Sequence, residues 1–145
     1  MDTISSLDAP CAADRLFAAV ADLGDYPGWL SIVNRAEPTG PAPGDEGPAW
    51  LVELRGRLGP LARSKRLRMV RTVMDVPGRL RFERREVDGR AHSPWVLDAE
   101  VESRDDGSRL TMRLHYGGSF GGTTLERMLA NEIDKSRPRL LELLD

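Results

Sequence analysis

The feature that most constrains the fold is a pair of alternating segments near the C-terminus, SPWVLDAEVESRDDGSRLTMRLHYGG at residues 93–118. Apolar and polar residues alternate in both, with the period of a β-strand that buries one face. Asp106 and Gly107 form a typical two-residue hairpin turn, and we pair the strands outward from them. This register pairs Val101 with Met112, Ala99 with Leu114, Leu97 with Tyr116, Glu100 with Arg113 and Asp98 with His115. One face is then apolar and the other charge-complementary, so we predict an antiparallel hairpin.

A long amphipathic segment follows this hairpin, TTLERMLANEIDKSRPRLLELLD at residues 123–145. About 20 helical residues at 1.5 Å each span roughly 30 Å, about the diagonal of a sheet in a small domain. Pro138 lacks an N–H, and we expect it to kink the helix axis. The segment therefore predicts a helix that covers the apolar face of a sheet. Its apolar stripe comprises Leu125, Met128, Leu129, Ile133, Leu140, Leu141 and Leu144.

The N-terminal part predicts one short strand and two helices. A weak alternation marks a strand at residues 3–7, and DAPCAADRLFAAVADL at residues 8–23 predicts a helix with Asp8 as its N-cap and Gly24 as its stop. The following DYPGWL places Tyr26 and Trp29 three residues apart, so one helical turn puts both rings on one face. We expect a very short second helix whose two aromatic side chains fill part of the interior.

The middle of the chain predicts antiparallel strands. Residues 39–48, TGPAPGDEGP, have the composition of a loop. Beyond it Trp50, Val52 and Leu54 share one face of a strand, and further strands are expected at about 63–75 and 79–87. Strands in series with helices on one face indicate an α+β fold. The whole chain, residues 1–145, is expected to form one domain.

The charge, the apolar runs and the single cysteine limit which partners and which cell compartment we expect. The net charge of −2 gives no general attraction to nucleic acid, and no apolar run is long enough to cross a membrane. The N-terminus lacks the basic and apolar regions of a secretory signal, so we expect a cytoplasmic protein. The only cysteine, Cys11, cannot form an internal disulfide and is read as a small buried hydrophobe.

The stretch APCAADRLFAAVADLGDYPGWLSIV, with the turn VPGRLRFE and the closing LLELL, resembles the START-like or SRPBCC superfamily, which includes the polyketide cyclase/dehydrase and lipid-transport group. Asp22, Tyr26, Pro27 and Trp29 are the centre of the resemblance. It implies a helix-grip fold, in which a curved antiparallel sheet wraps around a long C-terminal helix, with two short helices between the first and second strands. It also implies a cavity between sheet and helix for an apolar or amphipathic ligand.

Arg84 is the most informative charged residue, because it shares strand parity with Leu80 and Phe82 and should point inward with them. A three-residue loop at 76–78 pairs Arg71 with Glu83 and Arg68 with Glu86, and we prefer it to a two-residue turn that pairs Arg71 with Arg84. Two roles for Arg84 remain open. It either lies at the open rim, where it reaches water or pairs with Glu86, or binds a carboxylate or carbonyl oxygen of the ligand.

The resemblance and strand parity together give a set of candidate ligand-binding residues. The alternative is that these side chains simply fill a core, and Tyr116 is the one inward candidate for a proton donor. We name no catalytic residue. The candidates are Trp50, Phe82, Arg84, Trp95, Leu97, Met112, Leu114, Tyr116, Leu125, Met128, Leu129 and Ile133.

Two other features of the sequence do not meet the requirements of a metal site or a phosphate-binding loop. His92 and His115 lack the neighbouring ligands of a metal site, and GGSFGGTT at 117–124 has Thr123 where a phosphate-binding loop needs lysine. This connector could gate the cavity that the resemblance implies. We expect no metal and no cofactor.

The leading hypothesis is a carrier for a hydrophobic or amphipathic small molecule. The alternatives are a cofactor-independent cyclase or dehydratase and a regulatory or toxin-like protein partner.

Overall fold

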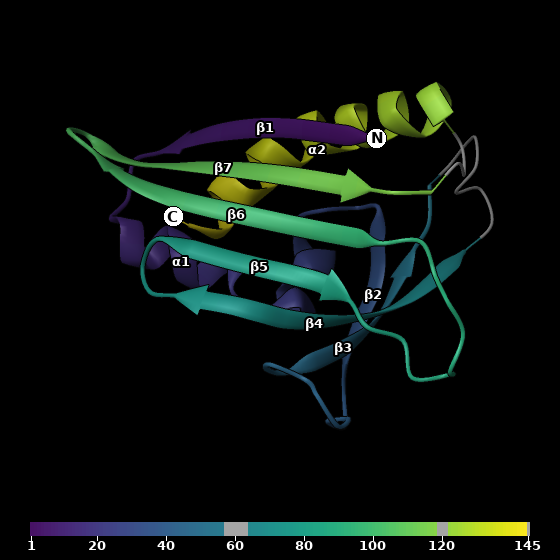
Figure 1. The fold of residues 1–145 in the computed structure, drawn as a ribbon. Helices are drawn as coiled ribbons and strands as arrows, with labels where there is room; N and C mark the ends of the chain where they lie inside the picture. The colour runs from purple at the N-terminus through teal and green to yellow at the C-terminus, as the bar shows by residue number, and fades with distance from the viewer. Residues whose placement is uncertain (57–63, 119–121, 145) are drawn as a thin grey trace.

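The computed structural model describes residues 1–56, 64–118 and 122–144, and within these ranges all strands join one curved antiparallel sheet (Figure 1). The strand order is β1-β7-β6-β5-β4-β3-β2, so the first strand pairs with the last. The elements are β1 (Asp2–Ala9), α1 (Ala13–Val20), η1 (Leu23–Gly28), β2 (Val33–Thr39), β3 (Ala49–Leu54), β4 (Lys65–Asp75), β5 (Arg79–Arg84), β6 (Trp95–Arg104), β7 (Gly107–Tyr116) and α2 (Gly122–Leu143). This is the predicted α+β arrangement, with α1 and the 3₁₀ helix η1 between the first two strands.

Helix α2 lies along one face of the sheet, behind β1 and β7 in the view of Figure 1. Leu125, Leu129, Leu140 and Leu144 of its predicted stripe are buried, since this side faces the apolar face of the sheet. Pro138 lies inside the helix, which continues to Leu143. The helix-grip fold expected from the sequence is therefore confirmed.

The β6–β7 hairpin forms, but its predicted register is wrong by two residues. The turn is Asp105–Asp106, and the structure pairs Val101 with Leu110, Ala99 with Met112, Leu97 with Leu114, Asp98 with Arg113 and Glu100 with Thr111. A shift of two keeps every side chain on its predicted face, which is why parity could not reveal it.

Gly107 has a different role from the predicted one. With a φ of 151° it begins β7, and a Cβ there would collide with the carbonyl oxygen of Ala9. The glycine allows the close approach of β1 instead of forming the turn.

The loop at 76–78 is confirmed, because Asp75 pairs with Arg79 across it. A bulge between Arg71 and Val73 then shifts the register by one residue. Arg71 therefore lies opposite Phe82, and the predicted pairing of Arg71 with Glu83 is wrong.

Arg68 is also displaced from its predicted cross-strand pairing with Glu86, although its backbone N–H donates to the Glu86 carboxylate at 3.2 Å. Its buried guanidinium donates instead to both carboxylate oxygens of Asp45, at 3.1 and 2.7 Å, and to the carbonyl of Gly40. Arg68 thus holds the loop between β2 and β3 against the sheet.

Helix α1 begins at Ala13, later than predicted, and Asp8 is not its N-cap. Asp8 lies in β1, where its carboxylate accepts hydrogen bonds from Arg109 on β7 at 2.7 and 3.1 Å. Because β1 pairs with β7 as far as Ala9, Asp8 is part of the strand and cannot cap α1. The helix also ends at Val20, before the predicted stop at Gly24.

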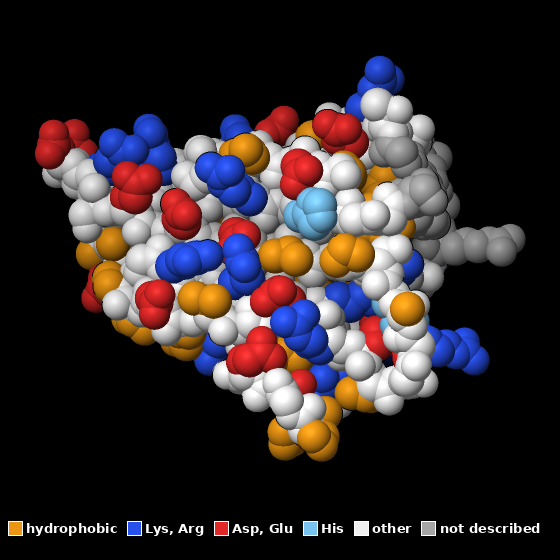
Figure 2. All heavy atoms as spheres, viewed as in Figure 1, with side chains coloured by type: hydrophobic (Ala, Val, Ile, Leu, Met, Phe, Trp, Pro, Cys, Tyr) orange, Lys and Arg blue, Asp and Glu red, His pale blue; other side chains and the backbone are white. Residues whose placement is uncertain are grey.

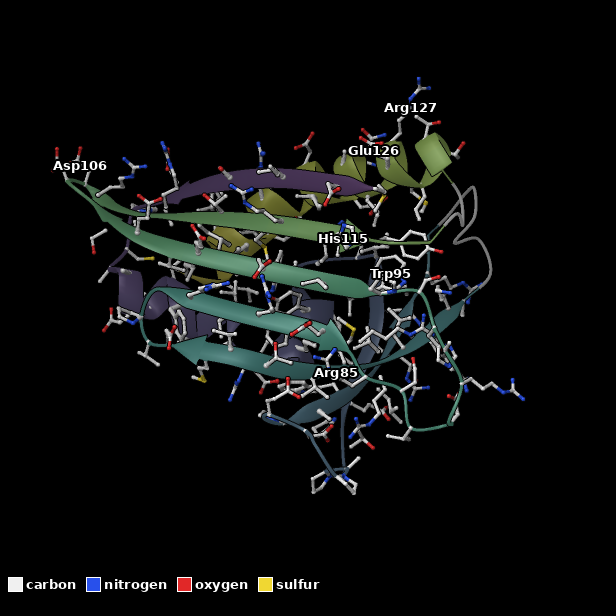
Figure 3. The ribbon with its side chains drawn as sticks, in the orientation of Figure 1. Arg85, Trp95, Asp106, His115, Glu126 and Arg127 are labelled. Carbon is white, nitrogen blue, oxygen red and sulfur yellow. The ribbon has the colours of Figure 1, made fainter. Side chains whose placement is uncertain are left out.

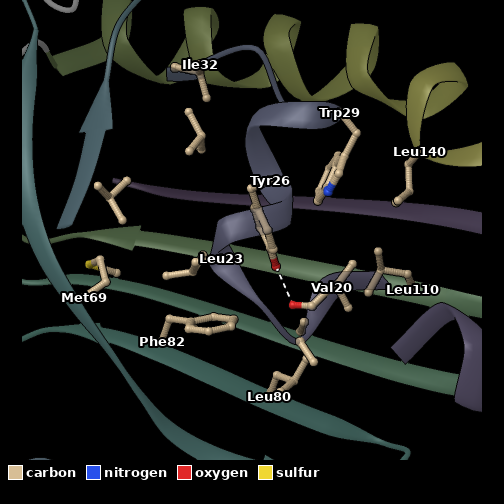
Figure 4. Close-up of a cluster of buried hydrophobic side chains, with 14 of the residues drawn as sticks. Val20, Leu23, Tyr26, Trp29, Ile32, Met69, Leu80, Phe82, Leu110 and Leu140 are labelled. Atoms are coloured by element: carbon tan, nitrogen blue, oxygen red, sulfur yellow. Dashed lines mark hydrogen bonds between the residues drawn. The ribbon is translucent and has the colours of Figure 1, made fainter. Parts of the chain in front are cut away.

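The short second helix is confirmed as η1, and Tyr26 and Trp29 lie on one side of it with ring centroids 4.8 Å apart (Figure 4). Asp22 caps it by accepting from the N–H of Gly24 at 2.7 Å. Both rings are buried, so η1 does fill part of the interior with aromatic side chains.

Tyr26 of η1 and three neighbouring residues are fully buried and form what we call the packed region: Val20, Tyr26, Leu80 and Phe82. The hydroxyl of Tyr26 donates to the carbonyl oxygen of Val20 at 2.9 Å. The rings of Tyr26 and Phe82 meet edge to face, with centroids 6.2 Å apart.

The opposite face of the sheet is charged, with Lys or Arg and Asp or Glu side chains interspersed over β4 to β7 (Figure 2). His115 lies on this face as expected (Figure 3), but it pairs across the sheet with Val96 instead of Asp98. Its Nδ1 contacts the Asp2 carboxylate at 2.9 Å, and Asp98 accepts from Arg81 at 2.8 Å.

Candidate functional site

A cavity of about 90 Å³ lies between the concave face of the sheet, η1 and α2. Every strand except β5 contributes to its wall, because the curvature of the sheet turns alternate residues of each strand toward α2. We refer to it below as the cavity. Its lining is Thr3, Leu23, Tyr26, Trp29, Leu30, Ile32, Val33, Val52, Leu54, Leu67, Met69, Trp95, Leu97, Met112, Leu114, Leu129 and Ile133.

The described part of the lining is almost wholly apolar and holds no Lys, Arg, Asp, Glu or His. Tyr26 is its one side chain with a titratable hydroxyl, and burial raises the pKa of that hydroxyl well above its usual value. Since the hydroxyl also donates to Val20, Tyr26 presents its ring rather than a reactive group to the cavity. The arrangement suits the burial of an uncharged hydrophobic surface.

Three polar atoms of the lining are exceptions to this apolar character. The Nε1 of Trp29, the Nε1 of Trp95 and the Oγ1 of Thr3 are buried, and none has a hydrogen-bond partner within the described ranges. Trp29 and Trp95 are 3% and 2% exposed, so water does not replace a protein partner at their rings.

A second, smaller cavity of about 20 Å³ adjoins the first and shares Trp29, Met112 and Ile133 with it. Arg137 of α2 lies in its wall, with one terminal nitrogen 3.0 Å from the Ser5 hydroxyl and 3.4 Å from the Asp134 carboxylate. Arg137 is the charged residue of this second wall.

The sequence-predicted site residues divide into two groups. Those on the inner face of the β6–β7 hairpin and the middle of α2 do line the cavity, and they are Trp95, Leu97, Met112, Leu114, Leu129 and Ile133. The others lie elsewhere in the interior or at its edge, and they are Trp50, Phe82, Arg84, Tyr116, Leu125 and Met128.

Phe82 and Trp50 pack against each other with ring centroids 5.8 Å apart, and Phe82 belongs to the packed region. The Arg71 guanidinium lies 5.9 Å from the Trp50 ring centroid. Tyr116 packs against Trp95 at 4.7 Å. Trp50, Phe82 and Tyr116 are buried in the interior beside the cavity and do not line it.

Arg84 lies at the end of β5 and is held by neighbours on its own side of the sheet. Its Nε donates to the Glu86 carboxylate at 2.6 Å, and its terminal nitrogens lie 3.3 Å from the Ser93 carbonyl and 3.3 Å from His92 Nδ1. The Arg84 side chain is 8% exposed. The ion pair with Glu86 that the sequence suggested is present, and Arg84 lies outside the lining.

Sequence reasoning missed the wall formed by η1, β2, β3 and β4. Val52 and Leu54 carried a usable signal, because they alternate with polar residues on a predicted strand. Trp29 was expected to fill part of the interior together with Tyr26, and nothing in the sequence assigned it to a ligand site.

Within the described residues, no three His, Cys, Asp or Glu side chains come close enough to hold a metal ion. Cys11 is half-buried and packs at the edge of the core. The connector proposed as a gate includes residues 119–121, which lie outside the described residues.

No helix in the described ranges has both the length and the apolar character needed to cross a membrane.

Comparison with known proteins agrees with this architecture. The sequence profile of a family described as polyketide cyclase/dehydrase and lipid transport matches residues 5–144. No curated protein sequence matches the chain.

Several solved structures share the fold at low sequence identity. A protein of Thermus thermophilus superposes with a TM-score of 0.77 at 13% identity, covering 99% of this chain and 97% of its own. A START superfamily protein of Mycobacterium smegmatis gives 0.72 at 10% identity, with 99% and 96% covered. A Deinococcus radiodurans protein gives 0.63 at 14% identity, with 98% of each chain covered.

Proposed function

This chain belongs to the polyketide cyclase/dehydrase and lipid transport family, and we propose that it binds a hydrophobic or amphipathic small molecule in the cavity. The observation that carries the proposal is the cavity's lining, which brings apolar side chains from η1, α2 and strands β2, β3, β4, β6 and β7 around one space. An apolar lining of this kind favours transfer of an apolar ligand out of water, by roughly 25 cal/mol for each Å² buried.

The size of the cavity bears on how a ligand would enter. About 90 Å³ is less than the roughly 300–1,000 Å³ of typical small-molecule sites. Binding of a larger molecule therefore requires the lining to move. Met69 and Met112 are suited to this, because an unbranched thioether side chain adapts to irregular shapes.

Catalysis is the alternative that the family description also includes. Proton transfer needs an ionisable group within hydrogen-bond reach of the substrate. The described lining offers only the Tyr26 hydroxyl, which is bound to Val20. Binding is therefore the function we propose.

Native mass spectrometry of the freshly purified protein, repeated under denaturing conditions, tests this proposal. We expect an additional mass in the native spectrum that disappears on denaturation and gives the molecular weight of the retained molecule. The matched control is Leu129→Trp, which enlarges a 2% exposed side chain of the lining and should remove that adduct.

A weakly held molecule can be lost during purification, so the spectra are repeated after incubation with ethylbenzene as a small apolar probe. Absence of adduct and probe from the wild-type protein, or retention undiminished in a folded Leu129→Trp variant, would contradict binding in the cavity.

A further inference from the structure

One hydrogen bond joins two segments that lie on different walls of the cavity. The hydroxyl of Ser31, in the loop between η1 and β2, donates to a carboxylate oxygen of Glu132 in α2 at 2.5 Å. The two residues are 101 positions apart in the sequence, so the bond is a tertiary contact between the loop and the helix. A carboxylate acceptor makes such a bond stronger than one between two neutral groups.

The residues beside this bond line the cavity. Leu30 and Ile32 flank Ser31 in the loop, and both belong to the lining. Ile133 follows Glu132 in the helix and belongs to the lining as well. The bond therefore lies at the border of the cavity, where the η1–β2 loop meets α2.

The position of this bond at the surface allows it to open. Ser31 is exposed, and the Glu132 side chain is 15% exposed. When a hydrogen bond at the surface breaks, water takes the place of each partner, so opening costs less than it would for a buried polar pair. Lys135 lies 3.9 Å from the second carboxylate oxygen of Glu132, but an exposed ion pair of this kind contributes little.

A second hydrogen bond holds α2 on its opposite flank. A terminal nitrogen of Arg137 donates to the hydroxyl of Ser5 on β1 at 3.0 Å. With about 3.6 residues in each helical turn, Ile133 lies between Glu132 and Arg137 around the helix. The helix is therefore attached to the η1–β2 loop on one side of Ile133 and to β1 on the other.

The two attachments differ in the support behind them. Strand β1 pairs with β7 in an unbroken register from Asp2 to Ala9. The η1–β2 loop instead leads into the start of β2, where the register with β3 shifts between Val33 and Arg35. An irregular strand start yields more readily than a continuous strand pair, so the loop is the side that can move away from α2.

We propose that a ligand enters the cavity between the η1–β2 loop and α2, and that the Ser31–Glu132 hydrogen bond holds this entrance closed. The inference rests on the proposed function, since it concerns access to the same cavity. A space of about 90 Å³ has to open for a larger molecule, and parting the loop from the helix breaks this bond. The bond re-forms around the bound ligand, so its loss lowers the barrier to entry and to exit alike.

The binding kinetics of ethylbenzene test this inference. Titration gives its Kd and exchange broadening in NMR spectra gives its dissociation rate, and the two together give the association rate. Ser31→Ala and Glu132→Ala each remove one partner of the bond, and the exposed position of Ser31 leaves the interior unchanged. Ser5→Ala is the matched control, because it removes a hydroxyl from the attachment of α2 to β1.

We expect Ser31→Ala to raise both rates about fivefold and to leave Kd unchanged, as the loss of one hydrogen bond from the closed state predicts. Glu132→Ala should do the same, and the double variant should be no faster than either single variant, because all three lack the same bond. Ser31→Thr keeps a hydroxyl and should keep the wild-type rates, as should Ser5→Ala.

An unchanged association rate in Ser31→Ala, an equal rise in Ser5→Ala, or increases that multiply in the double variant would overturn the inference. If ethylbenzene binds with any of these results, the cavity is a binding site with a different entrance and the proposed function stands. If ethylbenzene does not bind the wild-type protein, the proposed function fails together with the inference.

Discussion

The packed region and the cavity lie on either side of Tyr26, and they differ in how their polar atoms are satisfied. On one side the Tyr26 hydroxyl reaches the Val20 carbonyl at 2.9 Å, and Leu80 and Phe82 are fully buried. On the other side Tyr26 lines a space of about 90 Å³, and Trp29 and Trp95 of the same lining have buried N–H groups without a partner among the described residues. A filled interior with paired polar atoms is typical of a region built for stability. The cavity, in contrast, is where we propose that a ligand binds.

The largest expected effect comes from emptying the packed region. Phe82→Ala should lower the free energy of unfolding by about 3–5 kcal/mol, because it removes a fully buried ring that contacts Tyr26 and Trp50. Leu114→Ala, in the half-buried wall of the cavity, should lower it by only about 2 kcal/mol. Urea denaturation of both variants measures the difference, and equal losses would remove the distinction between the two regions.

Enlarging a side chain should have opposite results in the two regions. Leu80→Phe should destabilise the protein by about 1–3 kcal/mol, since a fully packed site has no room for a ring. Leu129→Phe should leave stability unchanged or raise it by about 0.5–1 kcal/mol, because its side chain borders free volume. Thermal unfolding of the pair decides this. A loss of similar size in both would mean that the cavity cannot accept added atoms.

A smaller effect is expected from the hydrogen bond at the boundary. Tyr26→Phe should lower the free energy of unfolding by about 1–2 kcal/mol, because it leaves the buried Val20 carbonyl without its side-chain donor. Chemical denaturation would measure the change. A neutral result would show that this polar pair adds nothing to the packed region.

Lowering the pH should reduce the stability of the fold without changing the affinity of the cavity for an apolar probe. The hydrogen bonds from the Arg68 guanidinium lower the pKa of Asp45 from 3.8 to about 2. The stabilisation by the charged Asp45 is present above pH 4 and is lost as the pH falls from about 4 to about 2. Asp45→Asn should remove this part of the acid dependence.

Binding of ethylbenzene, in contrast, should not change between pH 4 and pH 9, because the described lining contains no group that titrates there. Titrations at both limits check this. A change in affinity across that range in a protein that stays folded would show that an ionisable group reaches the cavity.

Much of the fold was predictable because strand parity and helix periodicity depend only on local sequence. The apolar face of β6 and β7, the stripe of α2 and the short aromatic helix all follow from such patterns. The register errors have non-local causes. Gly107 is required by the approach of Ala9, and the bulge after Arg71 changes the pairing with β5.

The candidate site was predictable only in part, for the same reason. Trp95, Met112 and Leu129 follow from alternation or helical spacing. The contribution of Trp29 depends on where η1 docks, and the exclusion of Arg84 depends on its ion pair with Glu86. Neither arrangement is encoded in the spacing of residues along the chain.

The comparison between the two regions is tested most directly by a crystal structure determined under xenon pressure. Xenon enters apolar cavities that are large enough to hold it and stays out of close-packed cores. We predict a xenon site bordered by residues of the cavity such as Trp29, Met112 and Ile133, and none among Val20, Leu80 and Phe82. Xenon in the packed region, or none in the cavity, would contradict the account.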